Sequence, residues 1–83
     1  MDFESHINEA TTRTHTICTT TPNTATITTP HNTLHLNYNT NEGAMGRIHW
    51  NLTRNTTLIK AGSFEITSTM TLADEITDLI KNT

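Results

Sequence analysis

The sequence predicts an α+β domain: an antiparallel β-meander of about five strands packed against a C-terminal α-helix. Threonine supplies 21 of the 83 residues, and its β-branched side chain favours strands. Apolar and polar residues alternate over 33–39 and 47–53, as in half-buried strands, whereas the last residues carry an apolar stripe at helical spacing. We expect residues 1–83 to form a single small domain.

Apolar side chains recur at helical spacing near the start of the chain: Phe3, Ile7 and Ala10. This spacing, with Asp2 as the N-cap, predicts a short helix over residues 2–10. The β-branched run that follows is expected to end the helix and to form a strand over 12–20, with Ile17 as its main apolar side chain. This strand is a candidate sheet edge, at which a second chain could pair.

Two proline-containing turns bound the next two strands, over 24–29 and 33–39. Thr21-Pro22-Asn23 predicts a turn, since proline fixes φ and asparagine tolerates a left-handed conformation, and Pro30-His31-Asn32 predicts the following turn.

A two-residue loop at Pro30-His31 also predicts the register between these strands. It places Ile27 opposite Leu34 and Ala25 opposite Leu36, so that the apolar residues of both strands share one face. The turn length and the alternating pattern therefore agree.

After a loop over 40–46 that contains two glycines, the strand over 47–53 points three apolar side chains inward: Ile48, Trp50 and Leu52. A two-residue loop at Asn55-Thr56 is expected to pair Leu52 with Ile59 and Trp50 with Ala61.

The apolar residues of the fifth strand change parity along its length. Ile59 and Ala61 are odd-numbered, whereas Phe64 and Ile66 are even-numbered. One face can hold all four only if an extra residue is inserted between them. Gly62 is the predicted position of this β-bulge.

The last helix is predicted to begin at Thr71, with Thr71 and Asp74 forming a capping box. Asp74 and Glu75 in its first turn and Lys81 in its last turn match the helix dipole. Its apolar stripe consists of Leu72, Ile76, Leu79 and Ile80. Sheet and helix together give a short predicted core: Leu34, Leu36, Ile48, Trp50, Leu52, Ile59, Phe64, Ile66, Ile76 and Leu79.

The predicted core is thin because only 33% of the residues are hydrophobic. Association commonly compensates for a core of this size, so we expect a homodimer or an obligate partner. The net charge of -3 is too small to favour an expanded chain.

Several features indicate a protein of the cytoplasm. The N-terminal residues lack the apolar segment of a secretion signal, and no apolar run reaches the roughly 18 residues of a membrane span. Cys18 is the single cysteine and cannot form an internal disulfide. We expect a cytoplasmic location, in the host cytoplasm if the protein is viral, and discount glycosylation at Asn51 and Asn55.

Five histidines and one cysteine raise the question of metal binding. His15 and Cys18 point to opposite sides of a strand, and His31 and His35 share a face about 13 Å apart. His35 and His49 are better placed: a three-residue loop would set them face to face, and a five-residue loop would set them diagonally. Two ligands do not complete a zinc site. We therefore expect no metal or other cofactor and leave the His35–His49 pair open.

Catalytic chemistry has no local signature in the chain. Cys18 lacks a recognisable base and orienting group, so its expected role is that of a small apolar side chain. The carboxylates Asp74, Glu75 and Asp78 are expected on the outer side of the last helix. A small metal- or Cys-dependent enzyme is therefore the least favoured hypothesis, and we expect no enzyme.

Nucleic-acid and ice binding are weakly indicated. Arg47, Arg54 and Lys60 lie on one predicted hairpin near Trp50, but three cations on an acidic chain provide little counterion-release energy. Thr-x-Thr pairs are typical of ice-binding surfaces, but here their spacing is irregular and turn signals interrupt them.

An interaction surface is the function class that remains. The predicted partner-binding residues are Asp74, Glu75 and Asp78 on the last helix, with Glu42 in the loop over 40–46. An acidic surface would attract a basic protein, such as a nucleic-acid-binding host protein, and would speed the encounter. We expect neither direct nucleic-acid binding nor membrane binding.

In its length, single-domain organisation and lack of catalytic motifs, the chain resembles the small accessory proteins of phages and other mobile elements, among them anti-CRISPR proteins. The resemblance implies a non-enzymatic module that inhibits a host defence protein by binding it. The alternative hypothesis is a structural protein that self-assembles, such as a small virion or scaffold component.

Overall fold

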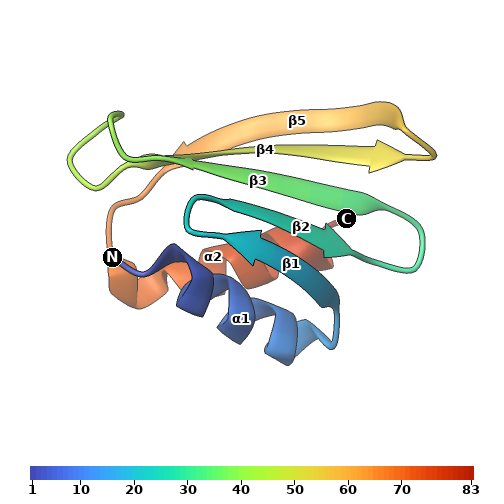
Figure 1. Cartoon of the computed structure of the whole chain (residues 1–83), viewed down its shortest axis with the longest axis horizontal. Helices are drawn as coiled ribbons and strands as arrows, with labels where there is room; N and C mark the ends of the chain where they lie inside the picture. The colour runs from blue at the N-terminus through green and yellow to red at the C-terminus, as the bar shows by residue number, and fades with distance from the viewer.

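Two helices pack on one face of a five-stranded antiparallel sheet in the computed structural model, which describes all 83 residues, Met1–Thr83 (Figure 1). The element order is α1 (Phe3–Thr14), β1 (Ile17–Thr21), β2 (Thr24–Thr28), β3 (Thr33–Asn39), β4 (Arg47–Arg54), β5 (Thr57–Glu65) and α2 (Thr69–Lys81). The strands pair in sequence order from β1 to β5. The predicted α+β architecture is confirmed, with its N-terminal helix, meander and C-terminal helix.

The core lies between the helices and the sheet face that points toward them. Its largest fully buried side chains come from both helices, the three central strands and the segment before α2: Phe3, Ile7, Ile27, Leu34, Ile48, Ile66, Leu72 and Ile76. Of the predicted core residues, Trp50, Phe64 and Leu79 are only partly buried at its margin. Neither helix has the length and apolar character needed to cross a membrane.

Helix α1 is longer than the predicted helix over 2–10. Asp2 caps it as predicted, since its Oδ1 accepts the N–H of Ser5 at 3.2 Å. The helix then continues through the threonine run, in which the hydroxyls of Thr11, Thr12 and Thr14 donate to backbone carbonyls one turn earlier. It ends at His15, which takes a left-handed conformation.

Strand β1 consequently begins at Ile17 and not at residue 12. Cys18 points toward the core, and Ile17 points to the opposite face, where it is 76% exposed. The expectation that Ile17 is the main inward side chain is therefore wrong. β1 is an edge strand, as predicted for the strand over 12–20. The predicted turn follows at Pro22-Asn23, and Asn23 has a negative φ there.

The register between β2 and β3 is the predicted one. Ile27 lies opposite Leu34 and Ala25 opposite Leu36, and the N–H of Thr29 donates to the carbonyl of Asn32 at 2.9 Å around the Pro30-His31 tip.

The buried Asn32 side chain fixes this turn to two distant parts of the chain. Its Nδ2 donates to the carbonyl of Thr83 at 2.9 Å, and its Oδ1 accepts the Nε–H of Arg54 at 2.9 Å. One amide thereby joins the turn to the end of β4 and to the C-terminal residue.

The β-bulge lies earlier in β5 than predicted. β4 and β5 pair around the two-residue turn Asn55-Thr56, but the register shifts between Leu52 and Thr53, which makes Ile59 the extra residue. Leu52 is therefore opposite Lys60, and Trp50 is opposite Gly62, in place of the predicted partners Ile59 and Ala61.

Close packing of the Trp50 indole gives Gly62 a different role from the predicted one. A Cβ atom at Gly62 would lie 2.7 Å from Cζ2 of Trp50, so glycine is needed beneath the ring and not at a bulge. The earlier bulge leaves Ile59 48% exposed, contrary to its predicted place in the core. It also turns Ala61 toward the face without helices.

Helix α2 begins at Thr69, two residues before the predicted start. Ser68 is the N-cap, and its Oγ accepts the N–H of Met70 at 3.1 Å. The predicted capping box of Thr71 and Asp74 does not form, because both residues lie inside the helix.

The β4–β5 turn offers a test of local strain. Asn55 and Thr56 have φ values of 50° and 66°, as a type I′ turn requires. A β-branched residue is disfavoured there, so Thr56→Gly should raise the free energy of unfolding by about 1 kcal/mol. Thr53→Gly, inside β4, should lower it by a similar amount. Urea denaturation of both variants checks the signs, and a destabilised Thr56→Gly variant would contradict the assignment.

Candidate functional site

The sheet face opposite the helices carries mostly uncharged polar side chains. Alternation along the paired strands places the following residues side by side at its centre: Thr24, Thr26, His35, Asn37, His49, Asn51 and Ser63. We call these residues the polar sheet face. A depression of about 620 Å³ is lined by all of these residues except Ser63. The face can donate and accept hydrogen bonds, but it presents no cluster of charge.

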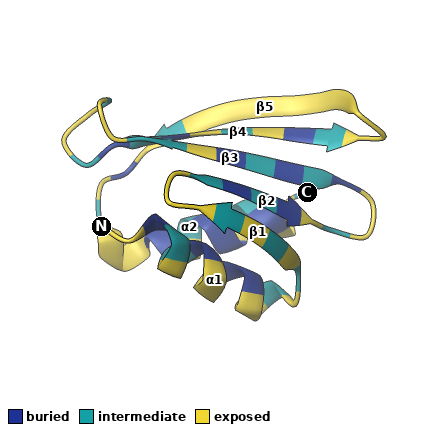
Figure 2. Ribbon diagram, viewed as in Figure 1, coloured by how far each residue is buried: buried dark blue, intermediate teal, exposed yellow.

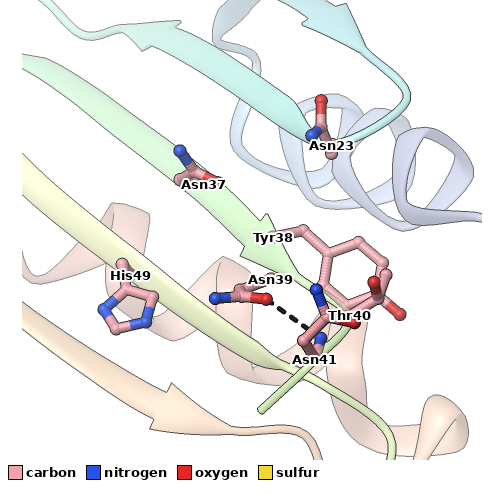
Figure 3. A pocket seen from close by; sticks show the side chains of 7 residues that line it. All are labelled: Asn23, Asn37, Tyr38, Asn39, Thr40, Asn41 and His49. Carbon is pink, nitrogen blue, oxygen red and sulfur yellow. Dashed lines mark hydrogen bonds between the residues drawn. The ribbon is translucent and has the colours of Figure 1, made fainter.

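A smaller pocket of about 350 Å³ adjoins the polar sheet face near the loop over 40–46 (Figure 3). Five of its lining residues carry amide or imidazole side chains: Asn23, Asn37, Asn39, Asn41 and His49. The loop is held by local hydrogen bonds, since Oδ1 of Asn39 accepts the N–H of Asn41 at 2.9 Å (Figure 3).

The predicted binding residue Glu42 is engaged within this loop region. Its Oε1 lies 3.0 Å from Nε2 of His49 and accepts the Nδ2–H of Asn39 at 2.8 Å. Its Oε2 lies 3.5 Å from Nε of Arg47. Arg47 and His49 point to the polar sheet face, so Glu42 does not share a surface with the acidic residues of α2.

The two histidines singled out for metal binding lie diagonally on the polar sheet face. His35 is opposite Asn51 and His49 is opposite Asn37, the arrangement expected for the five-residue loop. No three His, Cys, Asp or Glu side chains in the chain come together as ligands for one ion.

Cys18 contacts polar side chains that do not activate a thiol. Its Sγ lies 3.5 Å from Oγ1 of Thr11 and 3.8 Å from Oδ1 of Asn8. Neither group is a base of the kind that a cysteine nucleophile requires.

The two arginines of the central hairpin lie at opposite ends of β4, about 24 Å apart at the usual rise per residue. Arg47 is bonded to Glu42 and to Oγ of Ser63, and Arg54 to Asn32. The predicted grouping of cations is therefore not a continuous basic patch.

Asp74, one of the predicted partner-binding residues, is paired with α1. Its Oδ1 accepts Nη1–H of Arg13 at 2.6 Å, and Arg13 also bonds Glu9 at 2.9 Å. The hydrogen bond to Asp74 is the main cause of a raised pKa of Arg13, and the charge of Glu9 adds to it. All three side chains are exposed, so the cluster joins the helices at the surface.

Glu75 and Asp78 line a groove between β5 and α2 with a volume of about 510 Å³. We call it the acidic groove, and its lining residues are Phe64, Glu65, Thr67, Glu75, Asp78, Leu79 and Asn82. Phe64 and Leu79 are partly buried against the core and provide apolar surface. The carboxylates of Glu75 and Asp78 form no ion pair within the chain. The carboxylate of Glu65 lies against Gly43 on the other face of the sheet.

The sequence therefore indicated both carboxylates of the acidic groove, Glu75 and Asp78. It also placed Phe64 and Leu79 together in the core, whereas in the structure both are only partly buried and border the groove.

No protein family matches the chain, and comparisons with characterised proteins and with solved structures find no significant relative.

Glu42 is expected to order the loop over 40–46. Glu42→Ala removes its contacts with Asn39, Arg47 and His49, so the amides of Gly43–Met45 should exchange with solvent several-fold faster. Thr40→Ala, in the same loop and without a side-chain hydrogen bond, is the matched control. Hydrogen exchange followed by NMR measures both variants, and equal rates in wild type and Glu42→Ala would show that the loop is held by other contacts.

Proposed function

We propose that this protein is a non-enzymatic binding module that holds a basic segment of a partner protein in the acidic groove. The observation that carries the proposal is the presence of two carboxylates without cation partners, Glu75 and Asp78, beside partly exposed apolar side chains. Of the other acidic residues, Glu9, Glu42 and Asp74 are paired with cations of the chain itself. Asp2 caps α1 and Glu4 accepts the hydroxyl of Thr20, so these two carboxylates are engaged by hydrogen bonds.

The groove has the composition of a peptide-binding surface. Phe64 and Leu79 offer apolar contact to a side chain such as leucine, and Glu75 and Asp78 lie on the same wall, three positions apart on α2. A lysine or arginine beside the apolar anchor would then meet a carboxylate. Charge-assisted hydrogen bonds of this kind provide specificity and a fast encounter.

The partner that this chemistry favours is a protein with an exposed basic segment, as nucleic-acid-binding proteins have. Inhibition of such a host protein, in the manner of anti-CRISPR proteins, is the biological role that we propose. The acidic groove would act by occupying a surface that otherwise binds nucleic acid phosphates.

The hypothesis of a small metal- or Cys-dependent enzyme has less support. His35 and His49 have no third ligand beside them, and Cys18 has no base. The hypothesis of a self-assembling structural protein is supported by a separate feature, the edge of β5.

The proposal can be tested with a peptide that carries alternating leucine and arginine residues. Neutralising the groove in Glu75→Gln/Asp78→Asn should weaken binding about three- to tenfold, since each exposed ion pair contributes a few tenths of a kcal/mol to about 1 kcal/mol. Calorimetry at low salt measures the affinity, and NMR shifts of Phe64 and Leu79 locate the peptide.

The matched control is the double variant Glu9→Gln/Asp74→Asn. It changes the net charge by the same amount, but at the contact between α1 and α2 and outside the acidic groove. Affinity in this control should stay within twofold of wild type. An equal loss in both double variants would mean that only the overall charge attracts the peptide, and the groove would then have no binding role. When the host is known, affinity capture from its lysate can be compared for the two proteins. A partner protein that wild type captures and the groove variant does not would connect the acidic groove to inhibition.

A further inference from the structure

Strand β5 is a long sheet edge that the rest of the protein leaves uncovered. Eight of its nine residues are exposed, and only Phe64 is partly buried (Figure 2). Leu58 and Ile59 are 61% and 48% exposed. No strand pairs with the outer side of β5, so its outward backbone groups are free to bond another strand.

The residues with outward backbone groups can be assigned from the pairing with β4. The N–H of Ile66 donates to the carbonyl of Gly46 at 2.9 Å, in continuation of the β4–β5 register. Inward and outward pairs alternate along an antiparallel strand. The N–H and C=O groups of Ala61, Ser63 and Glu65 therefore point outward.

The stretch from Ala61 to Glu65 has few of the devices that usually block an edge, and Glu65 is its only charged residue. It contains no proline and no lysine, and the bulge at Ile59 lies outside it. The other edge strand, β1, has only five residues.

We propose that β5 pairs antiparallel with β5 of a second copy, with the two-fold axis at Ser63. The two five-strand sheets would then join into one continuous sheet of ten strands. This register uses the whole regular stretch, because Ala61 of each copy lies opposite Glu65 of the other. A register centred on Ala61 would instead place the bulge at Ile59 within the new ladder.

Side chains on both faces of the strand suit a second copy. On the helix side, Phe64 of each copy would lie opposite Gly62 of the other, over which the Trp50 indole packs, so that the two aromatic rings would meet. Lys60 lies opposite Ile66 of the second copy, next to the acidic groove that contains Glu75 and Asp78. Lys60, the single cation of β5, would therefore lie near the carboxylates of Glu75 and Asp78 of the other copy. This charge complementarity favours self-pairing.

On the other face, Ala61 lies opposite Glu65, which gives a direct test of the register. Ala61→Lys should place a cation opposite each Glu65 and tighten the dimer about three- to tenfold, since opposite charges on facing strands attract. Ala61→Glu should weaken it by a similar factor, and Ala61→Gln should have little effect. Ala61 is exposed, so all three variants should remain folded, which circular dichroism checks.

Sedimentation equilibrium over a wide range of protein concentration measures the dimer. In a Glu65→Gln background, Ala61→Lys and Ala61→Glu should lose their opposite effects, because the facing charge is gone. Equal behaviour of the lysine and glutamate variants in the native background would exclude this register, and a monomer at all concentrations would overturn the proposal. The dimer does not rest on the proposed function, because peptide affinity and self-association are measured separately.

Discussion

Ile27, Leu34 and Ile48 lie on three neighbouring strands and are buried beneath α1 and α2. Where this apolar contact between sheet and helices ends, the protein surface is exposed. Two helices side by side are about 20 Å wide, and strands are about 4.8 Å apart, so the helix layer can cover about four strands. The fifth strand has no helix of its own to cover it. β5 is therefore exposed, and the acidic groove lies where its end meets α2.

The large share of threonine is compatible with this core because most threonine hydroxyls near the helices bond to carbonyls. Thr77 is buried within α2, and its hydroxyl donates to the carbonyl of Ala73 at 2.7 Å. Thr11 does the same with Ile7 at 2.9 Å in α1. A buried hydroxyl without such a partner would destabilise the fold. Threonine thus serves both the strands and the inner faces of the helices.

Charge is distributed according to the same geometry. Cations near the helix pair and the loop over 40–46 form ion pairs within the chain: Arg13 with Glu9 and Asp74, and Arg47 with Glu42. The carboxylates of Glu75 and Asp78 beside β5 form no ion pair. These charges and the free backbone groups of β5 occur at one edge of the sheet, and both proposals concern this edge.

The sequence by itself determined the elements whose signals are local. Alternation fixed the inward residues of β3 and β4, and the Pro30-His31 turn fixed the register that joins Ile27 to Leu34. Helical spacing located both helices, and the acidic residues Glu75 and Asp78 were recognised as a candidate surface. These features could be predicted because each depends on residues close together in the chain.

The tertiary structure decided the features that depend on contacts between distant residues. The threonine run of α1 became helical because Ala10 and Thr11 are buried in the folded protein, although the β-branched side chains alone favour a strand. The bulge lies at Ile59, which places Gly62 and not Ala61 beneath the Trp50 indole. Asp74 pairs with Arg13 of α1 and therefore does not line the acidic groove. Pattern and spacing report which side chains share a face, whereas packing decides which of them meet.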